Sequence, residues 1–167
     1  MISPRTSPRG EWYNMELWFQ RFFTFRRFLG VSGMGVEWDE SLSVGIGIID
    51  DQHRKLIERV NAFADATESM DSREIENTIN YLTGYVIQHF GAEELIMIRN
   101  RYPRFKEHRD EHSSFVKQVF DVFSLLGERP MTKEEAVALR DTLVRWVTHH
   151  IRVTDHGISE TTKGALA

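Results

Sequence analysis

Apolar residues recur every three or four positions through four stretches of the chain, with short polar turns between them. This is the period of an amphipathic α-helix that buries one face. The pattern predicts helices from about Asp50 to Ser69, Asp71 to Arg99, Arg104 to Leu126 and Lys133 to Asp155. Because short turns make successive helices antiparallel, we expect an all-α protein, an up-down-up-down four-helix bundle.

Signals at two of the helix starts support these boundaries. Asp71 with Glu74, and Thr132 with Glu135, have the spacing of capping boxes. The same helical period defines the side chains that we expect in the core. They are Ile49, Leu56, Ile57, Val60, Phe63, Ile75, Ile79, Leu82, Val86, Phe90, Met97, Phe105, Phe115, Val119, Val122, Val137, Leu143, Trp146 and Ile151.

Residues 1–33 differ from the rest of the chain. Residues 15–29 repeat large apolar side chains at helical spacing and include three arginines, which predicts a basic amphipathic helix in a partly disordered extension. Three interpretations stay open: packing on the bundle or a second subunit, contact with a membrane surface, or an artefact upstream of an alternative start at Met34. We therefore expect an N-terminal extension (1–33), a bundle with a leading arm (34–160) and a C-terminal tail (161–167).

Composition narrows the class of protein. The net charge of −4 gives no general attraction to nucleic acid, and the lack of cysteine excludes disulfides, thiolate metal sites and iron–sulfur clusters. No apolar run approaches the roughly 20 residues of a membrane-spanning helix. We expect a cytoplasmic protein, a monomer or small homo-oligomer, with residues 15–29 as the contact to any membrane or protein partner.

Histidines and carboxylates fall at helical spacings on all four predicted helices. They are His53, His89 with Glu93, His108 with His112, and His150 with Asp155. Side chains four apart differ by about 40° around a helix and address the same point. The last pair is five apart, about 140° around a helix, so Asp155 would have to reach inward from a helix end.

Taken singly, each of these residues has a simpler explanation. A lone histidine is most often at the surface or hydrogen-bonded in a core, and Glu93 and Glu94 could both belong to a solvated face. The prediction of a metal site depends on convergence, because the inward faces of four helices each supply a ligand type. Imidazole and carboxylate accept several metals, so the residues alone do not select one.

The number of ligands favours two ions. The seven side chains are too many for one tetrahedral zinc, whereas two six-coordinate ions offer about twelve positions. Five imidazoles, two bridging carboxylates and a bridging oxide or hydroxide leave one position open for a small ligand. His108-Arg109-Asp110-Glu111-His112 lacks the glutamate of a metalloprotease helix, and no Glu-x-x-His pair of the ferritin-like type occurs.

Between about residues 36 and 155 the sequence resembles the hemerythrins, specifically the single-domain bacteriohemerythrins. The matching stretches are Trp38-Asp39, Asp50-Asp51-Gln52-His53, His89-Phe90-Gly91-Ala92-Glu93-Glu94 with Met97, Tyr102-Pro103, His108 with His112, and Trp146 with His150-Ile151 and Asp155. All seven family ligand positions are among them. The resemblance implies a non-haem centre of two iron ions (Fe2+/Fe3+), joined by an oxide or hydroxide, that binds dioxygen reversibly.

The resemblance also implies a role for each residue. His108, His112 and His150 would hold one iron, His53 and His89 the iron with the vacant position, and Glu93 and Asp155 would bridge the two. The apolar pocket for dioxygen would be Leu56, Phe90, Trp146, Val147 and Ile151, which core packing alone also explains. His149 would lie at the surface or behind the ligands, and His156 in solvent.

Three functions are compatible with such a centre. We expect oxygen transport, storage or delivery, so a binding protein rather than an enzyme. The alternatives are an oxygen or redox sensor, in which the N-terminal segment passes a signal to a partner, and a di-iron peroxidase or oxidase. No general acid or base beyond the ligands is visible in the sequence, which disfavours the enzyme.

Overall fold

The computed structural model describes residues 35–126 and 129–164 of the chain. The predicted amphipathic helix at residues 15–29 lies outside the described residues, so its three interpretations stay open. The division of the chain at residues 33 and 160 also stays a prediction. No helix among the described residues is long and apolar enough to cross a membrane.

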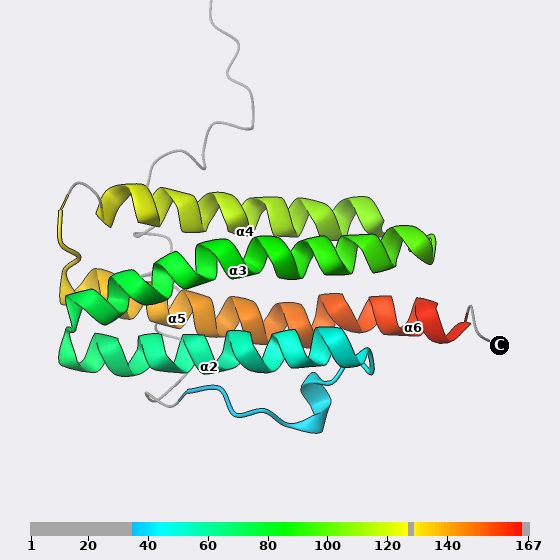
Figure 1. The fold of residues 1–167 in the computed structure, drawn as a ribbon, viewed down its shortest axis with the longest axis horizontal. Helices are drawn as coiled ribbons and strands as arrows, with labels where there is room; N and C mark the ends of the chain where they lie inside the picture. The colour runs from blue at the N-terminus through cyan, green and yellow to red at the C-terminus, as the bar shows by residue number, and fades with distance from the viewer. Residues whose placement is uncertain (1–34, 127–128, 165–167) are drawn as a thin grey trace, which may run out of the picture. The chain divides into compact units, whose positions relative to one another are not determined.

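Four long helices form the bundle (Figure 1). They are α2 (Gly47–Ser69), α3 (Ser72–Arg99), α4 (Phe105–Leu126) and α5 (Lys133–His149). Helix α2 packs on α3 and α5, and α3 also packs on α4. The predicted all-α four-helix bundle is therefore confirmed.

Both helix starts with a predicted cap have a side-chain cap in the structure. The Asp71 carboxylate accepts the backbone N–H groups of Arg73 and Glu74, and the Thr132–Glu135 capping box is complete. Helix α2, in contrast, begins three residues before Asp50. The Asp50 carboxylate does not cap the helix but accepts the Val44 backbone N–H at 2.8 Å. The Asp50 side chain thus binds the preceding arm.

The arm from residue 35 to 46 lies along α2 and contains a short 3-10 turn, η1 (Glu40–Leu42). Asn61 holds its start, because its amide accepts the Val36 N–H at 2.8 Å and donates to the Val36 carbonyl at 2.9 Å. Leu42 and Val44 are buried, and the Arg54 guanidinium lies 4.2 Å from the Trp38 ring centroid. The arm is thus tied to α2 by apolar, polar and cation–π contacts.

The last helix does not end where the apolar period predicts. A π-helical turn, η2 (His150–Asp155), follows α5 without a break, and α6 (His156–Gly164) continues from it. Helical structure therefore extends four residues into the stretch that we expect as a tail. A second small core cluster of Met97, Tyr102 and Ile158 holds α6 to the end of α3.

The main core fills the bundle with the side chains that the helical period predicts, except that Val137 is only half-buried and Ala136 is buried in its place. Trp146 and Val122 are partly exposed and pack against this core, and Phe105 packs against the second cluster. Ala136 and Val137 are adjacent, so the buried face of α5 is shifted by one position there. Such shifts are common because crossing angles, not periodicity, decide which flank of a helix is covered.

We predict opposite effects for two glycine-to-alanine substitutions. A Cβ at Gly157 would overlap the hydroxyl of buried Tyr102, whereas a Cβ at Gly84 meets nothing within 4 Å. Gly157→Ala should therefore lower the free energy of unfolding by about 1–3 kcal/mol through overpacking. Gly84→Ala, the control, should raise it by up to about 1 kcal/mol through helix propensity. Urea unfolding of both variants measures this, and equal effects would contradict the packing of α6 on Tyr102.

Candidate metal centre

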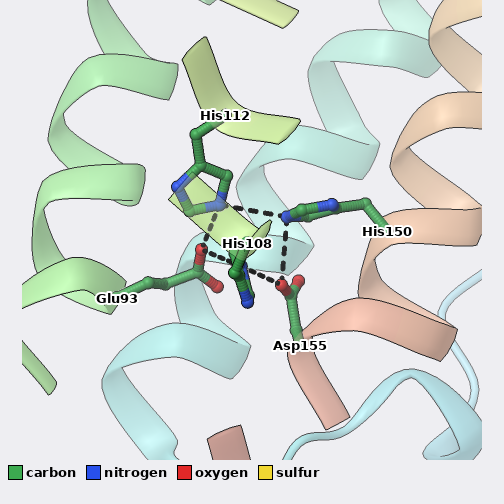
Figure 2. Close-up of side chains that lie close together, drawn as sticks. All are labelled: Glu93, His108, His112, His150 and Asp155. Carbon is green, nitrogen blue, oxygen red and sulfur yellow. Dashed lines mark hydrogen bonds and ion pairs between the residues drawn. The ribbon is translucent and has the colours of Figure 1, made fainter. Parts of the chain in front are cut away.

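All seven predicted ligand side chains lie together in the middle of the bundle. His53 comes from α2, His89 and Glu93 from α3, His108 and His112 from α4, and His150 and Asp155 from η2. Each of the seven residues is no more than 2% exposed. Figure 2 shows five of them with their polar ends pointing toward one another.

The π-helical turn explains how Asp155 reaches this centre. In a π-helix the backbone hydrogen bonds join residues five apart, so His150 and Asp155 begin and end one turn. Both side chains therefore lie on the same side of the helix, which an ordinary α-helix would not allow. Asp155 reaches inward from a widened turn within a continuing helix, not from a frayed end.

The inward atoms are close, but most of them are not hydrogen-bonded. Asp155 carboxylate oxygens lie 3.1 Å from Nε2 of His53 and of His150, and a Glu93 oxygen lies 3.1 Å from Nε2 of His112. Yet all four carboxylate oxygens, and the Nε2 atoms of His53 and His108, lack a partner with hydrogen-bond geometry. Their lone pairs converge on a common region, as those of metal ligands do.

The spacing of two imidazoles also fits a metal ion. Nε2 of His112 and Nε2 of His150 lie 3.1 Å apart. Two metal–nitrogen bonds of about 2.1 Å at right angles place the nitrogens about 3 Å apart. The donor set of the site, imidazole nitrogens and carboxylate oxygens in a buried cluster, therefore fits a metal ion in both spacing and chemistry.

The cluster contains two overlapping groups of ligand atoms. One is formed by Glu93, His108, His112, His150 and Asp155, and the other by His53, His89, Glu93 and Asp155. Atoms within each group lie within 4.8 Å of one another. Since Glu93 and Asp155 belong to both groups, the arrangement has the form of two metal positions that share two carboxylates, one with three imidazoles and the other with two.

Polar side chains outside the cluster hold three of the imidazoles by their outer nitrogens. His112 Nδ1 donates to Glu94 at 3.3 Å, and His150 Nδ1 donates to Glu111 at 3.1 Å. His89 Nδ1 lies 3.1 Å from the Gln52 side-chain oxygen. Carboxylate and amide oxygens only accept, so each of these Nδ1 atoms carries a proton and each Nε2 faces inward, where its lone pair is available to a metal ion when the imidazole is neutral.

These outer partners were not predicted from the sequence, and the suggestion that Glu94 is solvated was wrong. Glu94 is partly buried because it reaches from α3 to an imidazole of α4. Glu111 and Gln52 each precede a ligand histidine by one residue, but both serve a histidine of another helix. Only the relative placement of helices reveals such pairs. The five-residue spacing of His150 and Asp155 is a signal of the π turn, but it was interpreted as Asp155 reaching inward from a helix end.

The remaining histidines do not join the cluster. His149 is exposed. His156 is half-buried rather than fully in solvent, with Nε2 3.1 Å from the Ser41 carbonyl. This contact connects α6 to the arm.

Three imidazoles of the metal-free cluster have strongly shifted pKa values. Burial lowers the pKa of His53, but contacts with Asp155 and Glu93 and their negative charges outweigh burial and raise it to about 9. For His150, burial is outweighed by the charge of Asp155 and by contacts with Asp155 and Glu111, so the pKa rises to about 10. Burial dominates at His89, whose pKa falls to about 4.

The two shared carboxylates stay ionised despite their burial. Burial raises the pKa of both, and the charge of Asp155 also raises that of Glu93, but the surrounding imidazoles lower the pKa of each carboxyl well below its usual range. The cluster therefore holds two negative charges that require positive charge beside them. Protons supply it in the metal-free chain, and a metal cation would supply it in their place.

Aromatic rings pack against the imidazoles of the three-histidine group. Phe90 stacks on His112 with ring centroids 3.8 Å apart, and Trp146 stacks on His150 with centroids 4.3 Å apart. Leu56, Val147 and Ile151 are buried in the same core cluster as Phe90, and Trp146 packs against it. The five residues expected to form an apolar pocket thus belong to one core; the pocket itself stays a proposal.

The fold and the site together define a class: a four-helix bundle with a buried histidine–carboxylate cluster that could hold two metal ions. A family model described as the Hemerythrin HHE cation binding domain matches residues 44–160. Because this match covers more than half of the chain, the chain belongs to the hemerythrin family.

Individual relatives agree with this assignment. A bacteriohemerythrin of Stenotrophomonas maltophilia (strain R551-3) is 32% identical over 129 residues, which are 77% of this chain and 82% of that protein. A hemerythrin-like protein of Naegleria gruberi is 28% identical over 118 residues, 71% of this chain and 86% of that protein. A crystal structure of wild-type hemerythrin superposes with a TM-score of 0.65 at 26% identity, covering 75% of this chain and 96% of that one.

The pKa shifts predict how the stability of the metal-free protein depends on pH. His53 and His150 have folded-state pKa values above the unfolded value of about 6.5, so their stabilisation is complete below pH 6.5 and is lost toward pH 9–10. His89 has the opposite sign and costs stability below pH 6.5. We therefore expect the melting temperature of metal-free protein to fall between pH 6.5 and 9.5.

The control for this prediction is the metal-loaded protein over the same pH range. Its melting temperature should change less, because a bound ion holds the imidazoles deprotonated throughout. Calorimetry of both forms measures the difference. A metal-free melting temperature that rises between pH 6.5 and 9.5 would contradict the charge arrangement described here.

Proposed function

We propose that the protein binds dioxygen reversibly at a non-haem di-iron centre, for oxygen transport, storage or delivery. Membership of the hemerythrin family supports this proposal. The observation that carries it is the pair of overlapping ligand groups that share Glu93 and Asp155. An iron pair supplies two electrons to dioxygen and recovers them on release, which is the chemistry that the protein would require from it.

The unequal numbers of imidazoles suggest where dioxygen would bind. His108, His112 and His150 would hold one iron, and His53 and His89 the other, with Glu93 and Asp155 bridging and an oxide or hydroxide completing the pair. If both ions took the same coordination number, the two-histidine position would have one protein ligand fewer than the three-histidine position and so one open position. Dioxygen would take that vacancy, next to His53 and His89.

The other side chains around the site favour binding over catalysis. Leu56, Phe90, Trp146, Val147 and Ile151 would keep water and protons away from the bound gas, which slows oxidation of the iron. The nearest other carboxylates, Glu94 and Glu111, contact the outer nitrogens of histidines and do not face the cluster interior. A proton donor for peroxidase or oxidase turnover is therefore not provided by either of them.

Iron-loaded protein tests this function directly. Addition of dioxygen to the ferrous protein should produce a visible absorption band that disappears when dioxygen is removed, over repeated cycles, with two iron atoms per chain by metal analysis. A protein that consumes peroxide or a reductant at a steady rate would instead be an enzyme. A change of oligomeric state or partner affinity on oxidation would indicate a sensor, for which residues 15–29 are the first segment to delete.

We predict that replacing either of two ligands abolishes two-iron binding. Glu93→Ala removes a carboxylate common to both groups, and His112→Ala removes an imidazole of the three-histidine group. Both variants should contain fewer than two iron atoms per chain and show no reversible visible band. His149→Ala is the matched control, because His149 is exposed beside His150 and should keep the full iron content. Two irons per chain in either ligand variant would disprove the assignment.

A further inference from the structure

Glu111 connects two helices at the edge of the metal centre. It lies on α4, one residue before His112, but its carboxylate reaches across to η2. A single oxygen, Oε2, accepts from His150 Nδ1 at 3.1 Å and from the Thr154 hydroxyl at 3.0 Å. The Glu111 side chain is 48% exposed, while the His150 side chain is 3% exposed, so the contact extends from the surface to a buried candidate ligand.

The two groups that Glu111 holds lie at the two ends of the π turn. His150 begins the turn, and Thr154 comes immediately before Asp155, which ends it. π-helical turns are rare because their geometry is less favourable than that of an α-helix, so contacts with the rest of the fold have to maintain them. Hydrogen bonds to one carboxylate oxygen thus connect the first residue of this turn with the residue before its last.

The other outer partners make a narrower contribution. The Glu94 carboxylate accepts from the His112 imidazole and pairs with the Arg109 side chain at 3.9 Å, and neither partner belongs to the π turn. Gln52 holds His89 through a neutral amide oxygen. Glu111 therefore differs from both, because it fixes an imidazole through a charged acceptor and also holds the turn that carries Asp155.

We infer that Glu111 is a positioning residue for the three-histidine metal position: it orients His150 and maintains the π turn that brings Asp155 into the same group. This inference rests on the proposed function, in which that group holds one of two irons. Without the Glu111 carboxylate, the His150 ring can rotate and the turn can tighten toward an α-helix. The ion at the three-histidine position should then be held more weakly, because outer-shell acceptors are worth about 10–100-fold in metal affinity.

Three variants of the full-length chain test the role of Glu111. Glu111→Ala removes the acceptor, Glu111→Gln keeps an acceptor oxygen without the charge, and Glu107→Ala alters an exposed glutamate one turn earlier on α4 as the matched control. The measurement is the release of Fe2+ from loaded protein into an excess of a colorimetric chelator. Glu111→Ala should release one of its two ions about 10–100-fold faster than wild type. Glu111→Gln should release that ion at a rate between those of wild type and Glu111→Ala. Glu107→Ala should release both ions at the wild-type rate.

The melting temperature of each metal-free variant separates positioning from a general structural role. Glu111→Ala should melt within a few degrees of wild type while it loses one ion faster. Release of both ions at the wild-type rate would overturn the inference. So would an equal acceleration of both ions together with a large drop in metal-free melting temperature. Wild-type protein that holds fewer than two ions would instead contradict the proposed function itself.

A substitution of Thr154 tests the same pair of hydrogen bonds from the side of the π turn. Thr154→Val removes the hydroxyl that donates to Glu111 and keeps the shape of a buried side chain. It should accelerate release of the same ion, by less than Glu111→Ala. The double variant should release that ion no faster than Glu111→Ala alone, because both changes break one shared network. Fully additive effects would mean that the two residues act independently, which the inference excludes.

Discussion

Two buried carboxylates and five buried imidazoles meet in the core of this bundle, and the rest of the structure depends on compensating their charge. Transfer of an ionised carboxylate from water into an apolar interior costs several kcal/mol even after relaxation. Glu93 and Asp155 are fully buried, and none of their oxygens has a partner with hydrogen-bond geometry. A cation between the carboxylates and imidazoles would offset this cost, and metal binding would then be coupled to folding stability.

The surroundings of the cluster hold three of its imidazoles from the side that faces away from the cluster interior. Outer acceptors fix the Nδ1 protons of His89, His112 and His150, and stacked rings restrict the imidazole planes of the last two. Four helices contribute ligands, so the geometry is held by the whole bundle. A site constructed in this way needs little rearrangement when an ion enters, which favours tight binding.

One local departure from α-helical geometry makes the site complete. A regular helix would place Asp155 about 140° away from His150. The π turn removes that difference, and α6 then continues the helix, so Asp155 is held on both sides by helical structure. The contacts of Glu111 with His150 and Thr154 show how a charge on α4 can maintain this turn. Irregular backbone at this point serves the site, while the rest of the bundle stays regular.

The sequence by itself determined the helices, most of the core and the set of candidate ligands. Helical periodicity is local, so it predicted four helices and nearly all of their buried residues, and pairs such as His108 with His112 share a face in any α-helix. Tertiary structure decided which partner each element meets. The pairing of Glu111 with His150, and of Glu94 with His112, joins residues on different helices, and the packing of those helices sets such distances. The π turn also makes its contacts with Glu111 across to α4, whereas regular helical spacing alone left Asp155 about 140° from its partner.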